Sequence, residues 1–214
     1  KLQFESFSLL VSSSVVYYGG SHIQIVDWLK EHAKSNELVQ VIEVGCGDGR
    51  ALATMAERIP NVQSWTGVDI NAEIIARNQE TFAGRRELEF VTADATDWLT
   101  EHVGAGTLLM TYGGVMEYIA PETLKLWFTL IAQNRGAGVL LVEPVDPNHD
   151  LAADPESHFF GWEQSYSHNH RSLLERSGLR ILRSEEEYFT DYRFVLMLAA
   201  PAGQNTAAAN PKIP

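Results

Sequence analysis

The sequence predicts an α/β fold: a doubly wound, mostly parallel sheet of seven strands with a C-terminal antiparallel hairpin. Two observations lead to this expectation. Short runs rich in β-branched residues alternate with amphipathic helical runs from about residue 21 to residue 142, which is the pattern of repeated β-α-β units. Residues 179–189 and 191–199 then both have strand patterns, and so little chain separates them that they must pair antiparallel.

Proline and glycine residues mark the boundaries of several of the expected helices. Pro60 closes one helical run, Pro121 begins another, and Gly178 ends the last. Residues 1–200 are expected to form one domain, followed by a flexible tail over 201–214 that has no apolar period. The expected helices are 21–34, 48–59, 72–82, 121–134 and 171–177, and the remaining expected strands are 38–44, 62–70, 88–93, 107–111 and 138–142.

The composition narrows the class of partner. A net charge of −12 disfavours binding to nucleic acid, and the only adjacent pair of basic residues is Arg85–Arg86. The single cysteine, Cys46, excludes an intrachain disulfide and suits a reducing compartment, so we expect a cytoplasmic protein. The apolar run at 9–16 is too short to cross a bilayer, and no membrane association is expected. Nothing in the sequence predicts the oligomeric state.

The most informative motif is the glycine-rich stretch VIEVGCGDGR at 41–50, on the turn from the first strand of the sheet to its helix. Glycines there permit a tight turn and a close approach of the backbone to a ligand. Glu43 and Asp48 add two negative charges where a dinucleotide would place its pyrophosphate. The loop therefore favours a cationic ligand without phosphate, although Asp48 could instead be only the N-cap of the helix.

Two further carboxylates follow neighbouring strands. Asp69 ends the second strand of the sheet, twenty residues after Gly49, where a carboxylate can accept hydrogen bonds from both hydroxyls of a ribose. Asp94 ends the third, in VTADATDW at 91–98, where it could accept from an adenine amino group while the Ala95 backbone contacts the ring. The alternative for Asp94 is a cap on the turn that follows its strand.

These segments resemble motif I, the acidic end of strand two and the strand-three motif of class I S-adenosylmethionine-dependent methyltransferases. The C-terminal hairpin resembles the final strands of that family, so the resemblance covers about residues 38–200. It implies a methyltransferase that binds S-adenosylmethionine and transfers a methyl group to O, N or C of a small-molecule acceptor. The expected cofactor-binding residues are Tyr18, Glu43, Gly45, Gly47, Asp69, Ile70, Asp94, Ala95, Thr111 and Tyr112.

The acceptor class is predicted from the segment 107–121. Methyltransferases that modify amino groups of nucleic acids have an Asn/Asp-Pro-Pro-Tyr/Phe motif here, and this chain has TYGG. The aspartates that hold magnesium in catechol-type methyltransferases are also missing. We therefore expect a small-molecule acceptor, no nucleic-acid partner and no metal.

The segment 143–170 has the least regular pattern and is rich in histidine and aromatic residues. It could form a lid over the acceptor, in which His149, His168 or Tyr166 acts as the catalytic group. It could equally be a packed connection with its histidines on the surface. Its acidic residues Glu143, Asp146 and Asp150 would suit a cationic acceptor, but solvated loop acids explain them as well.

Two other functions remain open. An NAD-dependent oxidoreductase shares the β-α-β unit, but it would have Gly-x-Gly-x-x-Gly, and the third glycine falls one position early here. A non-catalytic relative that binds the cofactor to regulate a partner would show the same motifs.

Overall fold

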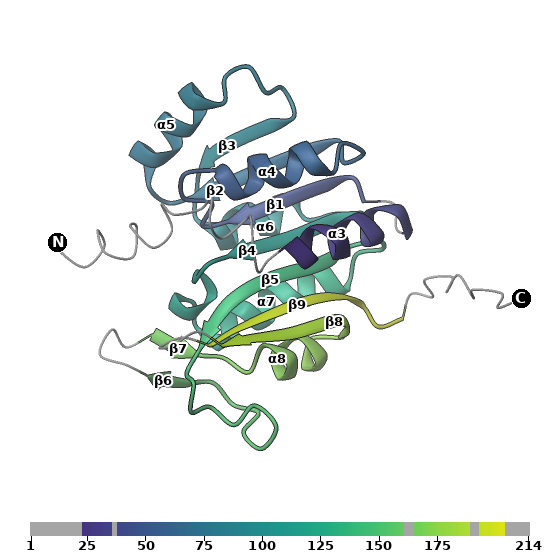
Figure 1. Ribbon diagram of the computed structural model, residues 1–214, viewed down its shortest axis with the longest axis vertical. Coiled ribbons are helices and arrows are strands. Elements are labelled where there is room, and N and C mark those ends of the chain that lie inside the picture. Colours follow the sequence, from purple (N-terminus) through teal and green to yellow (C-terminus); the bar gives the residue numbers. More distant parts are fainter. Residues whose placement is uncertain (1–22, 36–37, 161–164, 189–192, 204–214) are drawn as a thin grey trace, which may run out of the picture.

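The computed structural model describes the chain apart from residues 1–22, 36–37, 161–164, 189–192 and 204–214 (Figure 1). Within the described residues, seven strands form one sheet in the order β3-β2-β1-β4-β5-β9-β8. β1 to β5 are parallel, and β9 runs antiparallel between β5 and β8. The predicted fold class is confirmed. The strands are β1 (Gln40–Val44), β2 (Ser64–Asp69), β3 (Leu88–Thr92), β4 (Thr107–Tyr112), β5 (Gly138–Val145), β8 (Leu179–Tyr188) and β9 (Arg193–Pro201).

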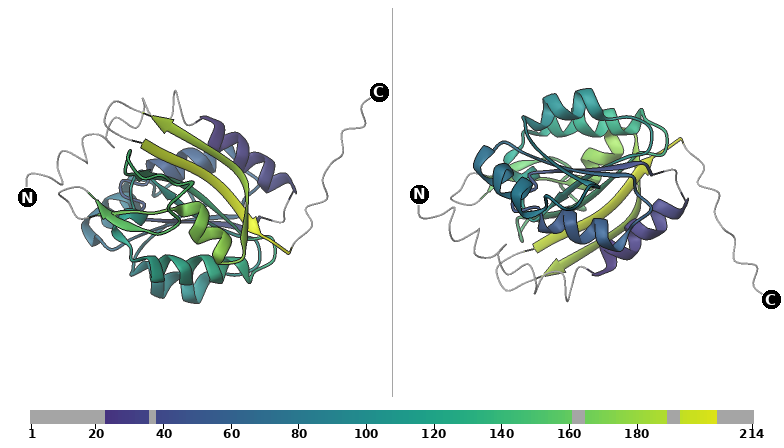
Figure 2. Two further views of the ribbon diagram at one scale, coloured as in Figure 1. Left: turned by 90° about the horizontal axis from the view of Figure 1, so that it is seen from below. Right: turned by 90° about the horizontal axis from the view of Figure 1, so that it is seen from above.

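Helices cover both faces of the sheet (Figure 2). Because successive side chains of a strand point to opposite faces, the strands divide the apolar interior into two cores. One core includes Ile25, Leu52 and Ile75 from the first set of helices, and the other includes Leu99 and Trp127 from the second. The first set is α3 (Ile23–Ser35), α4 (Arg50–Arg58) and α5 (Ala72–Thr81), and the second is α6 (Ala95–His102), α7 (Pro121–Ala132) and α8 (His170–Arg176).

The C-terminal strands pair antiparallel as predicted, but their order in the sheet was not predicted. Every residue of β9 is buried, in keeping with its nearly continuous apolar sequence. β8 lies at the edge and exposes the consecutive acids Glu185 and Glu186. Charged side chains on an edge strand discourage further strand pairing, so the more polar of the two strands occupies the outer position.

The sequence patterns missed four elements. α6 begins directly after Asp94, and a 3-10 helix, η1 (Met116–Tyr118), follows β4. Two short strands, β6 (His158–Phe160) and β7 (Ser165–Ser167), pair antiparallel with Phe159 opposite Tyr166 and are called the β6–β7 pair below. The expectation of an irregular segment was therefore wrong for these two strands.

Some boundaries also differ from those expected. β9 extends to Pro201, so the first residue of the expected tail belongs to the sheet. The rest of that tail from 204 onward, and the expected cofactor contact Tyr18, lie outside the described residues. Among the helices that the structure describes, none combines the length and the apolar character needed to cross a membrane.

Candidate active site

The candidate site lies where the strand order of the sheet reverses. β1 pairs with β2 on one side and with β4 on the other. The chain leaves β1 toward α4 on one face, whereas it leaves β4 toward η1, whose Met116 packs in the core of the opposite face. Such divergence opens a crevice at the carboxyl ends of parallel strands, and open α/β sheets bind ligands there.

The three glycines after β1 serve different purposes. Gly45, Gly47 and Gly49 all have positive φ, at 66°, 49° and 72°. A Cβ atom on Gly45 would lie 2.6 Å from a methyl carbon of Val115, and one on Gly49 would lie 2.6 Å from the ring of Phe90. A Cβ on Gly47 would meet nothing within 4 Å. Gly45 and Gly49 are therefore required by packing within the protein, and only Gly47 borders open space.

Hydrogen bonds from β2 and α5 fix this glycine loop. The backbone N–H of Gly47 donates to Asp69 Oδ2 at 3.1 Å, and Asp69 Oδ1 accepts from the N–H of Asn71 at 2.9 Å. Asn78, buried on α5, donates to the carbonyl of Gly47 at 2.7 Å. The sequence interpretation missed Asn78, whose signal is a polar residue on the inward face of an amphipathic helix. The loop is thus held in shape before any ligand arrives.

The two acids of the glycine loop do not form a pair of free charges. Asp48 forms an ion pair with Arg50 and also accepts from its backbone N–H at 3.1 Å. The N-cap of α4 is Gly49, so the alternative of Asp48 as N-cap was wrong. Glu43 is buried, and burial, together with the nearby carboxylates Asp48 and Asp69, raises its pKa well above the usual range. Because Asp48 is paired with Arg50 and Glu43 is held neutral, the two acids do not jointly repel a phosphate, and the expectation from the sequence was wrong on this point.

Glu43 nevertheless has an unmet polar atom. Its Oε2 is buried and has no hydrogen-bond partner among the described residues. A buried unpaired carboxyl oxygen is costly, and a cation or a hydrogen-bond donor brought by a ligand would satisfy it. Together with the open space beside Gly47 and the carboxylate of Asp69 at the rim, this suits a ligand that carries positive charge and no phosphate.

The remaining expected cofactor contacts fall into two groups. Ile70 and Asp94 lie exposed after β2 and β3, and Ile70 exposes 78% of its surface. Asp94 caps α6: its Oδ1 accepts from the N–H groups of Thr96 at 2.7 Å and Asp97 at 3.2 Å, as the alternative interpretation expected. Ala95 is the first residue of that helix, beside Asp94.

On β4, by contrast, the expected contacts are less accessible. The side chain of Thr111 is fully buried, and Tyr112 at the end of the strand is half-buried.

Glu143 near the end of β5 is a site residue that the sequence interpretation treated as a loop acid. It is fully buried, and its Oε2 accepts from the N–H groups of Val115 at 2.9 Å and Met116 at 3.0 Å. Burial raises its pKa to about 8, although the Thr111 hydroxyl and the two N–H groups oppose the shift. Because Val115 packs against Gly45, Glu143 links the turn after β4 to the glycine loop.

The other two acids that the sequence grouped with Glu143 each accept a hydrogen bond within a local turn. Asp146 Oδ1 accepts from the N–H of Asn148 at 2.8 Å, and Asp150 Oδ1 accepts from that of Ala152 at 3.1 Å. They therefore cap turns, as Asp residues often do, and do not join Glu143 in a cationic-acceptor cluster.

Beyond η1, four rings form a continuous row from the surface to the interior. The centroids of Phe159 and Tyr166 are 4.2 Å apart, those of Tyr166 and His168 are 5.1 Å apart, and those of His168 and His170 are 5.5 Å apart. Phe159 exposes 64% of its surface, whereas His168 and His170 are buried. β7 packs against η1 and β5, which places this aromatic row near the carboxyl edge of the sheet.

Two of the three expected catalytic groups are occupied by structural contacts. His168 Nε2 lies 3.0 Å from the carbonyl of Met116, so it carries a proton and donates, and Nδ1 lies 2.8 Å from the Ser157 hydroxyl. His149 contacts the Ser167 hydroxyl through Nδ1 at 2.8 Å and the carbonyl of Asp154 through Nε2 at 3.2 Å.

Burial lowers the pKa of both of these imidazoles, that of His168 to about 4. Both rings are thus neutral at neutral pH and engaged at both nitrogens, and the expected surface position of the histidines was wrong for His149, His168 and His170. Tyr166 is half-buried and remains the candidate of the three that lies nearest to solvent.

Comparison with known proteins agrees with this geometry. A family model described as a methyltransferase domain matches residues 41–133, which include the glycine loop, Asp69 and Asp94. Magnesium protoporphyrin IX methyltransferase from Synechocystis, solved with bound SAH, is similar over 83% of this chain and 80% of its own, with a TM-score of 0.58 and 19% identity.

Two further structures cover more of their own length. An S-adenosylmethionine-dependent methyltransferase from Clostridium acetobutylicum matches 94% of this chain and 99% of its own, with a TM-score of 0.60 and 12% identity. The N-methyltransferase NodS from Bradyrhizobium japonicum matches 83% and 94%, with a TM-score of 0.61 and 11% identity. At sequence identities this low, the similar structures establish only the fold, whereas the match to the family model indicates a methyltransferase domain. A methyltransferase-domain family thus matches residues 41–133, and together with the Rossmann-like fold of the whole sheet this supports a class I S-adenosylmethionine-dependent methyltransferase.

Proposed function

We propose that this protein transfers a methyl group from S-adenosylmethionine to a small-molecule acceptor. The observation that carries the proposal is the arrangement at the glycine loop, where Asp69 holds Gly47 at the border of open space and Glu43 keeps a buried, unpaired carboxyl oxygen. Several structural neighbours are described as bound to SAM or SAH, which supports the same cofactor here.

In this proposal the cofactor lies across the carboxyl ends of β1, β2 and β4. Asp69 accepts hydrogen bonds from the ribose hydroxyls, and the exposed side chain of Ile70 packs on the adenine. Asp94 uses Oδ1 for the α6 cap, and its second oxygen receives the adenine amino group beside Ala95. Gly45, Gly47 and the turn Thr111–Tyr112 flank the methionine part, and the buried, unpaired carboxyl oxygen of Glu43 offers it a hydrogen-bond partner.

The acceptor is placed against the aromatic row on the β6–β7 pair. Phe159 and Tyr166 offer flat apolar surface, which suits a small molecule with an apolar or planar portion. The bound cofactor supplies an already activated methyl group, so the protein contributes chiefly alignment and exclusion of water. Neither His149 nor His168 is proposed as the base, because both nitrogens of each ring are engaged.

Ligand binding and transfer test the proposal together. S-adenosylhomocysteine is expected to bind in isothermal calorimetry, and NAD is expected to give no heat at the same concentrations, because the carboxylate of Asp69 lies beside Gly47, where a pyrophosphate would lie. Label from methyl-labelled S-adenosylmethionine is expected to appear in a fraction of a metabolite extract below about 1 kDa.

Each result that contradicts these expectations would favour a different function. Tighter binding of NAD than of S-adenosylhomocysteine would favour the oxidoreductase. Cofactor binding without transfer into any fraction would favour a non-catalytic relative, and transfer into nucleic acid or protein alone would remove the small-molecule acceptor.

The aromatic row gives a separate prediction for the acceptor side. Tyr166→Ala and Phe159→Ala are each expected to raise the KM for the acceptor by about fivefold, since each removes stacking surface worth about 1 kcal/mol. Affinity for S-adenosylhomocysteine should not change. Leu126→Ala is the control, because Leu126 is an exposed apolar residue on α7.

Tyr166→Phe distinguishes the ring from its hydroxyl. If the hydroxyl takes part in proton transfer, turnover falls by about 10²–10⁴-fold with KM unchanged; if only the ring matters, the variant keeps full activity. Unchanged KM in both alanine variants would place the acceptor elsewhere.

A further inference from the structure

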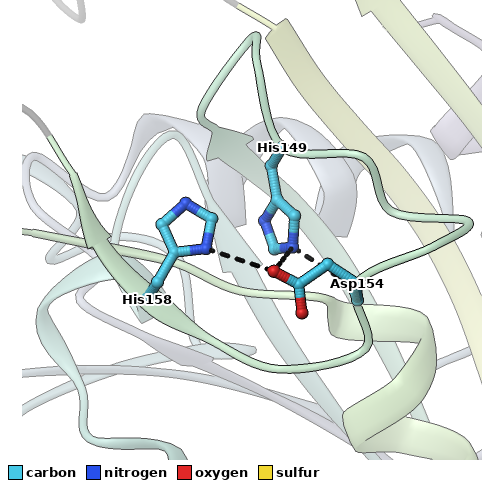
Figure 3. A group of neighbouring side chains, drawn as sticks. All are labelled: His149, Asp154 and His158. Carbon is cyan, nitrogen blue, oxygen red and sulfur yellow. Dashed lines mark hydrogen bonds and ion pairs between the residues drawn. The ribbon is translucent and has the colours of Figure 1, made fainter.

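Three side chains between β5 and β6 converge on one point (Figure 3). Asp154 Oδ2 lies 4.0 Å from His149 Nε2 and 3.9 Å from His158 Nδ1. One donor atom from each of the three residues lies within 4.8 Å of the other two. Two imidazole nitrogens and one carboxylate oxygen are a donor set that borderline-soft divalent metals prefer.

In both imidazoles, the ring nitrogen that points away from Asp154 lies near an oxygen of another residue. The Nδ1 of His149 lies 2.8 Å from the Ser167 hydroxyl, and the Nε2 of His158 lies 3.7 Å from Asp146 Oδ2. Each ring therefore turns one nitrogen toward Asp154 and the other toward an oxygen of a neighbouring residue. For His149 this contact is the outer hydrogen bond that commonly fixes the tautomer and ring orientation of metal-binding histidines, and for His158 the carboxylate of Asp146 takes the corresponding position at ion-pair distance.

The backbone that carries the cluster is anchored by two other elements. Arg193 on β9 donates to the carbonyl of His149 at 2.7 Å. Asn169, the N-cap of α8, donates to the carbonyls of Leu151 at 2.8 Å and Asp154 at 2.9 Å. This pre-organisation lowers the entropy cost of closing the three groups around an ion.

The cluster is nevertheless accessible from solvent. The side chain of His149 is buried, but those of Asp154 and His158 are 50% and 39% exposed. An ion can therefore reach the cluster, and a water molecule can complete its coordination.

We propose that His149, Asp154 and His158 bind a divalent transition-metal ion of the zinc type. The ligand atoms are His149 Nε2, His158 Nδ1 and a carboxylate oxygen of Asp154, with water as the fourth ligand. Tetrahedral zinc places its ligand atoms about 3.3 Å apart, so the two distances to Asp154 must shorten by about 0.6–0.7 Å. Small rotations of the partly exposed Asp154 and His158 side chains supply this movement. Magnesium and calcium are disfavoured because they prefer oxygen ligands alone.

Binding changes the hydrogen bonding of His149. Without metal, its Nε2–H donates to the carbonyl of Asp154 and its Nδ1 accepts from the Ser167 hydroxyl. With metal, Nε2 gives its lone pair to the ion and the proton moves to Nδ1, which then donates to Ser167. The ion joins the segment after β5 to the first residue of β6, and it thereby stiffens the β6–β7 pair. This inference does not depend on methyl transfer.

Zinc binding to the chelator-treated full-length chain tests the proposal. Isothermal calorimetry with zinc chloride is expected to show one site per chain, and magnesium chloride is expected to show none. His158→Ala and Asp154→Asn should weaken zinc binding at least tenfold, and Asp146→Asn should weaken it by about tenfold through the orientation of His158. His102→Ala is the matched control, because His102 is an exposed histidine outside the cluster.

Thermal unfolding and nitrogen NMR provide two further measurements, which zinc would not change if the three residues had only a structural role. Zinc should raise the Tm of the unmodified protein but not that of His158→Ala, because only a ligand of the folded state stabilises it. The nitrogen shifts of His149 should report the change of tautomer on addition of zinc. Absence of zinc binding by the unmodified protein, equal binding by His158→Ala and Asp154→Asn, or equal affinity for magnesium would each overturn the proposal.

Discussion

Replacing Glu143 with leucine is expected to lower the free energy of unfolding by about 3 kcal/mol. The carboxyl group is fully buried and accepts from the N–H groups of Val115 and Met116. Leucine leaves both donors buried and unpaired, and each such group costs about 1–3 kcal/mol. Glu143→Gln keeps an acceptor oxygen of the same shape, so at neutral pH it should stay within about 1 kcal/mol of the unmodified protein. Denaturant unfolding followed by circular dichroism measures both.

The same carboxyl group predicts a pH dependence. Its pKa is about 8 in the folded chain, against an ordinary value of 4.5, because burial disfavours the charged form. Between these two values the folded state holds a proton that the unfolded state has released. The stability that this group contributes is therefore full below about pH 4.5 and falls by up to about 1.4 kcal/mol per pH unit as the pH rises to about 8. Above that value it changes no further.

A comparison of two proteins isolates this effect from the other titrating groups. Glu143→Gln lacks the titration, so its stability should fall less than that of the unmodified protein between pH 5 and pH 8. The difference in free energy of unfolding between the two proteins, plotted against pH, isolates the contribution of Glu143. Parallel curves would show that Glu143 is ionised in the folded state, and a fully stable leucine variant would show that Val115 and Met116 find other acceptors.

Asp69→Ala is expected to weaken binding of S-adenosylhomocysteine by at least tenfold, or about 1.5 kcal/mol. In the proposed complex it removes two charge-assisted hydrogen bonds to the ribose, and it also releases the N–H of Gly47 from Oδ2. The fold should survive, because Asp69 is the last residue of β2 and is only half-buried. Calorimetry measures the affinity, and Glu80→Ala, which removes an exposed carboxylate from α5, is the control for net charge.

A ligand analogue separates the ribose contact from the loop contact. A cofactor analogue without the 2′- and 3′-hydroxyls should bind the unmodified protein more weakly than S-adenosylhomocysteine does. In Asp69→Ala the two ligands should bind about equally, because the partner of those hydroxyls is gone. If the preference persists in the variant, Asp69 acts only through Gly47, and an unchanged dissociation constant would remove it from the site.

Glu143 and Asp69 hold the glycine loop from opposite sides. Asp69 fixes Gly47 directly, whereas Glu143 fixes Val115, which packs where Gly45 has no side chain. The loop after β1 and the turn after β4 therefore pack against each other, and their conformations depend on one another. A change on β5, far along the sequence, is expected to reach the cofactor site through this contact.

The sequence by itself determined the sheet, its parallel direction and its antiparallel end, because hydrophobic period and loop length are local properties. It also located the glycine loop, Asp69 and Asp94, because the carboxyl ends of parallel strands meet at one edge. The short helix α6 escaped prediction because its eight residues carry only one buried side chain, Leu99, which is too few for a visible period.

Only the tertiary structure decided which polar residues are buried and what they contact. Glu143 and Asp146 are three residues apart in one acidic stretch, yet the first supports the turn after β4 from the core and the second caps a local turn. His149 and His158 are joined to Asp154 by a fold of the backbone that Arg193 and Asn169 anchor from far along the chain. The spacing of residues in the sequence predicts which side chains share one face of a helix or strand. Burial and long-range contacts arise only when these elements pack together.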